Sequence, residues 1–164
     1  MSHPLRVIFI GASRAGKTTL CQALRHEELR YHKTQTISVV GGFIIDTPGE
    51  YLERGRMRGA LSVAAADAQL VVFLLAAKAA QSFFSPGLAS MFNKPCVGVI
   101  TKADIASAAD IEKARVELER AGAERVFVTS SRTGDGIQAF ADYLAQFDKE
   151  GAQRREEKKL QVSA

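Results

Sequence analysis

The chain contains no tryptophan, two cysteines, three histidines and four prolines. The cysteines, Cys21 and Cys96, are too few to staple a small secreted domain, so we expect two reduced thiols in the core. The histidines lack the spacing of metal ligands, which argues against a zinc motif. Residues 63–80 form the longest apolar region, but Asp67 and Lys78 interrupt it, so the sequence predicts no membrane span.

Charged residues of one sign are not in large excess either. The 164 residues carry a net charge of +4, with 46% hydrophobic and 24% charged residues, as in an average soluble protein. This charge is too small to predict a nucleic-acid partner, which requires basic residues clustered on one face. The length fits one domain with a sizeable core, and the sequence lacks a signal-peptide pattern, so we expect a cytoplasmic protein.

Short apolar runs alternate along the chain with segments of helical periodicity. Strands are expected over residues 5–10, 36–40, 43–46, 70–76, 96–100 and 126–129. Helices are expected over residues 16–29, 52–66, 82–93, 107–121 and 136–147. The pair Gly41-Gly42 predicts a hairpin, which adds one antiparallel edge strand. The alternation predicts an α/β fold with a mostly parallel six-stranded sheet covered on both faces.

The charged residues gather at the end of the chain. Residues 1–147 are expected to form a single domain, and no internal repeat or linker divides them. Residues 148–164 are rich in lysine, arginine and glutamate, which predicts either a helical extension or a disordered tail.

A phosphate-binding motif, G-x-x-x-x-G-K-[ST], lies between the first strand and the first helix. Gly11 and Gly16 allow the tight turn that points backbone N–H groups at an anion, and the helix adds its positive N-terminal end. Lys17 supplies charge to the β- and γ-phosphates, and the Thr18 hydroxyl is a ligand that Mg²⁺ accepts. The expected nucleotide-binding residues of this segment are Gly11, Ala12, Ser13, Arg14, Ala15, Gly16, Lys17, Thr18 and Thr19.

The segment Asp46-Thr47-Pro48-Gly49 follows a predicted strand and comes after the phosphate loop in sequence. An acidic residue at this point holds Mg²⁺ through water in P-loop NTPases, a role that we assign to Asp46. The Gly49 N–H is placed to sense the γ-phosphate. Alone, D-x-x-G usually marks only a turn, and its position after the phosphate loop gives it weight.

Two further polar segments follow the last two predicted strands. An aspartate in the segment 101–104 can accept hydrogen bonds from guanine N1–H and N2–H₂, which adenine does not offer, and a lysine stem can cover the base. The segment 130–132 can give a backbone N–H to guanine O6. Alone, the first segment is more often a helix cap, and the second is equally well a plain loop. The expected base-binding residues are Thr101, Lys102, Asp104, Ser130, Ser131 and Arg132.

Taken in this order, the four motifs resemble those of the small Ras-like GTPases, from residue 5 to about residue 147. The chain resembles more closely the EutP/PduV family of bacterial microcompartment operons for ethanolamine and propanediol utilisation. Residues 16–20, 33–35 and 46–51 carry this second resemblance. It implies a three-layer Ras-like P-loop NTPase fold, GTP or GDP as the ligand and Mg²⁺ as the cofactor. It also implies association with microcompartment shell proteins or enzymes.

The chain departs from the Ras-like pattern at three positions. Thr101 stands where these GTPases usually have asparagine, and Glu50 stands where they carry the glutamine that orients the attacking water. The switch threonine is either Thr34 or Thr36, and the resemblance favours Thr34. Arg14, inside the phosphate loop, either supplies positive charge in cis or points outward to solvent.

The resemblance implies a GTPase with slow intrinsic turnover. Catalytic roles fall to Lys17, Thr34, Gly49 and Glu50, and Mg²⁺ ligation to Thr18, Asp46 and Thr34. One alternative is a nucleotide-dependent phosphotransferase, since some EutP-like proteins are described as acetate kinases. Another is a non-catalytic, nucleotide-dependent adaptor. In that case Phe83, Phe84, Met91 and Phe92 would form an exposed docking surface, whereas the alternative for these side chains is a helix that packs them into the core.

Overall fold

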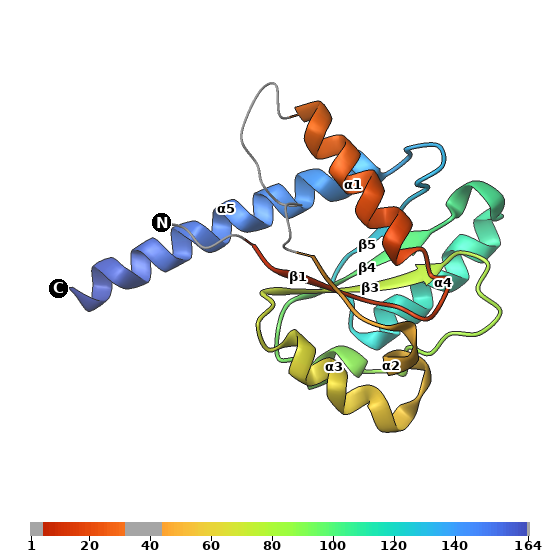
Figure 1. The fold of residues 1–164 in the computed structure, drawn as a ribbon, viewed down its shortest axis with the longest axis horizontal. Coiled ribbons are helices and arrows are strands. Elements are labelled where there is room, and N and C mark those ends of the chain that lie inside the picture. The colour runs from red at the N-terminus through yellow and green to blue at the C-terminus, as the bar shows by residue number, and fades with distance from the viewer. Residues whose placement is uncertain (1–4, 32–43, 164) are drawn as a thin grey trace.

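Parallel strands form one sheet at the centre of the molecule (Figure 1). The computed structural model describes residues 5–31 and 44–163, and its sheet has five strands. The strands are β1 (Val7–Ile10), β2 (Ile44–Asp46), β3 (Leu70–Ala76), β4 (Cys96–Thr101) and β5 (Val126–Val128). Their order is β2-β1-β3-β4-β5. The predicted α/β class is confirmed, and the parallel strands bring their carboxyl ends to one edge of the sheet.

The predicted number and direction of the strands were wrong in detail. The described residues form five strands rather than six, and all of them are parallel. The edge strand β2 pairs with β1 in parallel, with Ile44 opposite Val7 and Asp46 opposite Phe9. The strand predicted at residues 36–40, which was to supply the antiparallel edge, lies outside the described residues.

Helices cover both faces of the sheet (Figure 1). The α-helices are α1 (Lys17–Tyr31), α2 (Gly49–Glu53), α3 (Arg58–Ala65), α4 (Ala108–Ala121) and α5 (Ile137–Val162). Successive side chains of β1 point to opposite faces, as the period of two in a strand requires. Phe9 packs with the helices α1 and α5, and Ile8 and Ile10 pack with α3 and α4. This two-sided burial explains why the strands read as continuous apolar runs.

Two predicted helices are shorter than expected. The segment 52–66 is divided into α2, a 3₁₀ turn (Gly55–Met57) and α3, because Arg54 between them has an extended backbone. The segment 82–93 contains only a 3₁₀ turn (Leu88–Met91), because Pro86 lacks an N–H and Gly87 adopts a left-handed φ of 75°.

The aromatic side chains of the segment 82–93 belong to the core. Phe84 and Phe92 are buried, and their ring centroids lie 4.8 Å and 6.0 Å from that of Phe73 on β3. Phe83 and Met91 are half-buried and pack against the same cluster. The alternative prediction that these four side chains form an exposed docking surface is therefore wrong, because the rings fill the space between the sheet and this segment.

A capping box begins α4. The Ser107 hydroxyl accepts a hydrogen bond from the Asp110 N–H, and the Asp110 carboxylate accepts one from the Ser107 N–H, each at 3.1 Å. These bonds lower the pKa of Asp110. We expect Ser107→Ala to reduce the free energy of unfolding by about 1 kcal/mol, measured by urea denaturation. Ser107→Asp, which keeps an oxygen acceptor, is the control, and an equal loss in both variants would contradict the capping role.

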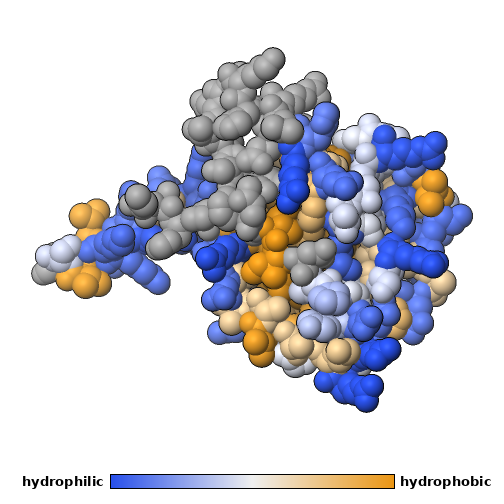
Figure 2. Space-filling view, in the orientation of Figure 1, coloured by the Kyte–Doolittle hydropathy of each residue, from blue (hydrophilic) through white to orange (hydrophobic). Residues whose placement is uncertain are grey.

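The last helix extends past the predicted domain boundary. Residues 148–162 continue α5, which projects beyond the sheet in Figure 1. Its outer half is mainly hydrophilic in Figure 2, with exposed Leu160 and Val162 near the tip. Over residues 5–31 and 44–163, no helix combines the length and apolar composition needed to cross a membrane.

Candidate nucleotide-binding site

The turn between β1 and α1 has the backbone shape of an anion-binding loop. Arg14 and Gly16 adopt left-handed φ angles of 67° and 91°, and such residues in a turn orient successive N–H groups toward a common concavity. Gly11 packs tightly against β3, since a Cβ there would lie 2.9 Å from the Leu74 carbonyl oxygen. The Ala15 N–H closes the turn by donating to the Ala12 carbonyl at 3.1 Å.

Lys17 points its ammonium group back into this loop. Its Nζ donates to the carbonyl oxygens of Gly11 at 2.7 Å and Ala12 at 3.2 Å, and the residue is only 9% exposed. The positive charge therefore lies inside the turn, where weak screening by water strengthens its attraction for an anion. Thr18 follows in the first turn of α1, with its side chain exposed, and Thr19 is exposed beside it.

The segment after β4 is tied to the phosphate loop. Thr101 is buried, and its hydroxyl donates to the Ala15 carbonyl at 2.6 Å. Lys102 has a left-handed φ of 58°, and its Nζ donates to the Arg14 carbonyl at 2.7 Å. Two consecutive side chains thus hold the predicted base-binding segment against the predicted phosphate-binding segment, while the Arg14 side chain is exposed.

Asp104 meets the segment that follows β5. The hydroxyl of buried Ser130 donates to Asp104 Oδ1 at 2.9 Å, which holds the carboxylate at the end of the sheet. The Ala103 N–H donates to the Thr129 carbonyl at 3.1 Å and joins the same two loops through the backbone. Ser131 is half-buried and Arg132 is exposed in the turn beyond. The structure therefore brings Thr101, Lys102, Asp104 and Ser130 together with the phosphate loop.

The segment after β2 lies against the other side of the phosphate loop. The buried Thr47 hydroxyl donates to the Phe9 carbonyl at 2.8 Å, which fixes this segment to the end of β1. Gly49 approaches the loop so closely that a Cβ there would lie 2.2 Å from the Ser13 backbone nitrogen. Only glycine fits this contact. The strand register places the Asp46 backbone opposite Phe9, one position before the end of β1.

The two acidic residues of α2 differ in position. Glu50, predicted as a catalytic residue, is exposed in the first turn of the helix. Glu53 reaches the phosphate loop, where its Oε1 accepts a hydrogen bond from the Ser13 N–H at 2.6 Å. The Ser13 backbone bond lowers the pKa of Glu53, assisted by the Ser13 hydroxyl and by the charge of Lys17.

Glu53 was not predicted as a site residue, because no sequence motif includes it. The available signal was its spacing: Gly49 and Glu53 are four residues apart, so they share one face of a helix, and a contact by one places the other nearby. Thr34 and Thr36, the candidate switch threonines, lie outside the described residues.

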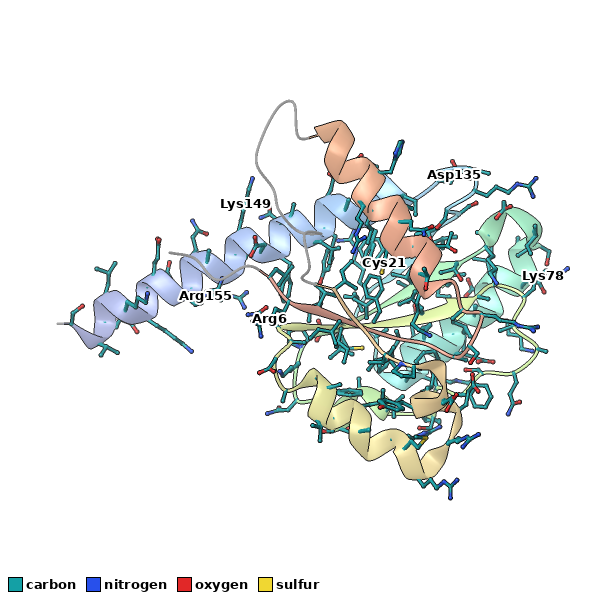
Figure 3. The ribbon with its side chains drawn as sticks, in the orientation of Figure 1. Arg6, Cys21, Lys78, Asp135, Lys149 and Arg155 are labelled. Atoms are coloured by element: carbon teal, nitrogen blue, oxygen red, sulfur yellow. The ribbon has the colours of Figure 1, made fainter. Side chains whose placement is uncertain are left out.

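A cavity of about 550 Å³ adjoins the phosphate loop on the side of α2. Its wall includes Ser13, Glu53, Lys78 and Lys102, together with apolar residues such as Leu52 and Phe84. In Figure 3, Lys78 and Asp135 lie at the end of the molecule that holds the carboxyl ends of the strands, whereas Lys149 and Arg155 lie along α5 on the opposite side.

Comparison with known proteins finds relatives among PduV and EutP proteins and among GTPases. The propanediol utilization protein PduV of Citrobacter freundii is 42% identical over 85% of this chain and 92% of its own. "Probable acetate kinase EutP" of Escherichia coli is 32% identical over 88% of this chain and 92% of its own. The GTPase Era of Sinorhizobium medicae is 32% identical over 88% of this chain and 53% of its own.

A solved structure and a family model also match this chain. The apo crystal structure of translation elongation factor SelB from Methanococcus maripaludis matches with a TM-score of 0.62 and 19% identity, over 90% of this chain and 34% of that one. This likeness confirms the predicted Ras-like P-loop NTPase fold. The family model described as "Ethanolamine utilisation - propanediol utilisation" matches residues 5–146. Because the family model covers most of the chain and PduV is 42% identical to it, this chain belongs to the PduV-EutP family.

Proposed function

We propose that this protein binds GTP and GDP with Mg²⁺ and hydrolyses GTP slowly. The observation that carries the proposal is the pair of hydrogen bonds from Thr101 to Ala15 and from Lys102 to Arg14. These bonds join the segment that contains Asp104, to which we assign base binding, to the loop to which we assign phosphate binding, and a nucleotide would span both. The similarity to the GTPase Era supports guanine as the base.

The residues of the phosphate loop suit a nucleotide with Mg²⁺. Mg²⁺ prefers hard oxygen ligands, and the Thr18 hydroxyl at the start of α1 is such a donor. We assign Mg²⁺ binding to Thr18, to Asp46 through water and to Thr34. When bound, Mg²⁺ neutralises negative charge on the phosphate oxygens. Lys17 would stabilise the same charge directly, and the Gly49 N–H would contact the γ-phosphate.

Slow turnover is proposed from the residues of α2. Glu50 replaces the glutamine of Ras-like enzymes, and a carboxylate is repelled by the γ-phosphate that it would have to approach. Measurement of phosphate release over multiple turnovers tests this. Several turnovers per second without a partner protein would contradict it.

Base recognition is tested by calorimetric titration with GDP, GTP, ADP and ATP, with and without Mg²⁺. We expect GDP to bind about a hundredfold more tightly than ADP, which corresponds to ~2.7 kcal/mol. Asp104→Ala should abolish most of this preference, because it removes the acceptor for both guanine donors. Asp135→Ala is the matched control, since the exposed Asp135 side chain lies in the neighbouring loop. Equal affinity of the unmodified protein for GDP and ADP would refute the assignment.

A phosphotransferase is the second candidate function. Two observations favour it: the name of the EutP relative, and the cavity beside the phosphate loop, which has room for a small acceptor. A coupled assay for acetyl phosphate formed from acetate and ATP or GTP decides between the candidates. Formation of acetyl phosphate at a rate above that of nucleotide hydrolysis would favour the phosphotransferase.

We also propose that the protein acts together with a bacterial microcompartment for ethanolamine or propanediol utilisation. The family description and the name of the PduV relative refer to ethanolamine and propanediol utilisation, which supports the metabolic part of this proposal. Co-purification of the tagged protein with intact microcompartments tests it, and complete recovery in the unbound fraction would speak against it.

A further inference from the structure

The helix α2 is seated on the phosphate loop through two contacts to the same residue. Gly49 lies against the Ser13 backbone, with no room for a side chain, and the Glu53 carboxylate accepts the Ser13 N–H. The pKa of Glu53 is lowered, so its carboxylate stays ionised at neutral pH. One N–H of the anion-binding loop is therefore already occupied by an anion that belongs to the protein.

We propose that Glu53 is a specificity determinant that disfavours a nucleoside triphosphate relative to the diphosphate. This inference rests on the proposed function, because it concerns the same phosphate-binding loop. The carboxylate occupies the side of the loop that faces α2. Gly49, the residue expected to contact the γ-phosphate, lies on this same side. The γ-phosphate of a triphosphate would therefore approach Glu53 more closely than the α- and β-phosphates do.

The energetic argument is one of like charges. A γ-phosphate and a carboxylate cannot share the Ser13 N–H, and two negative groups a few ångströms apart repel each other. Binding of the triphosphate therefore requires Glu53 to give up its hydrogen bond and move away. The diphosphate, which lacks the third phosphate, avoids most of this cost.

The structure also provides the route by which Glu53 leaves. Leu52 is buried in the core and holds α2 in place, whereas Glu53 is half-exposed. Rotation of the Glu53 side chain into water releases the Ser13 N–H without unfolding the helix. The cavity beside the loop, whose wall includes both Ser13 and Glu53, gives the side chain room to turn.

The test compares Glu53→Gln and Glu53→Ala with the unmodified protein. Calorimetry at pH 7.5 with Mg²⁺ measures the Kd of GDP and of the non-hydrolysable triphosphate GppNHp. We expect Glu53→Gln to bind GppNHp about tenfold more tightly and GDP less than about threefold more tightly, because the substitution removes charge with little change of shape. Glu119→Gln, which removes an exposed charge from α4, is the control and should change neither Kd.

The outcomes separate this inference from the proposed function. An unchanged or weaker affinity of both Glu53 variants for GppNHp, with guanine nucleotides still bound, would overturn the inference alone. No binding of any guanine nucleotide by the unmodified protein would overturn the proposed function. In that case tripolyphosphate and pyrophosphate, titrated in the same way, still test Glu53. We expect tighter binding of tripolyphosphate to Glu53→Gln, and equal affinities for it would overturn the inference.

Discussion

Lys17→Ala is expected to weaken the binding of GTP and GDP by about a thousandfold, or about 4 kcal/mol. The Lys17 ammonium lies within the phosphate loop, held by the carbonyl oxygens of Gly11 and Ala12. Incoming phosphates would exchange these neutral acceptors for charged ones, and hydrogen bonds to charged groups are the stronger kind. Calorimetric titration with GDP and GTP measures the effect.

Two companion variants make this result specific to the charge. Lys17→Met keeps most of the apolar stem and should lose affinity to a similar degree. Lys149→Ala removes a lysine from the exposed surface of α5, far from the loop, and should bind nucleotide normally. Circular dichroism without nucleotide checks that each variant is folded. An affinity of folded Lys17→Ala within tenfold of the unmodified protein would exclude the assigned role.

Gly136→Ala is expected to lower the free energy of unfolding by about 3 kcal/mol or more. Gly136 precedes α5 with a left-handed φ of 74°, and a Cβ there would lie 2.0 Å from the Val128 carbonyl oxygen. The substitution therefore adds a collision with β5 to the strain of the left-handed backbone. The turn 130–135 should shift as well, because it joins β5 to this position.

Gly134→Ala is a matched control in the same turn. Gly134 also has a left-handed φ, of 87°, but a Cβ there would meet no heavy atom within 4 Å. Its replacement should therefore cost only the backbone strain, about 1–2 kcal/mol. Urea denaturation of both variants measures the difference. Equal destabilisation would show that the contact with Val128 carries no additional energy.

Local patterns made much of the fold predictable. The helical periodicity of residues 107–121 predicted α4, which begins at Ala108. The continuous apolar runs of β1, β3 and β4 were visible because both faces of the sheet are buried. The segment 82–93 was wrongly predicted as a helix, because its apolar residues pack into the core from an irregular backbone that contains only a 3₁₀ turn.

The candidate site was only partly predictable. Sequence motifs selected Lys17, Thr101 and Asp104 because the chemistry of a nucleotide restricts residue type and spacing. They missed Glu53, because its hydrogen bond to Ser13 spans 40 positions and depends on how α2 is seated. They selected Glu50 by its place in a motif, and the structure places this residue, exposed, in the first turn of α2.

The sequence by itself determined the phosphate loop and the alternation of strands and helices, because both arise from interactions among neighbouring residues. The tertiary structure decided which segments meet at the sheet edge. The bond from Thr101 to Ala15 joins positions 86 residues apart, and the parallel pairing of β2 with β1 joins separate segments. Such contacts depend on the packing of all the layers at once, and no local spacing in the chain encodes them.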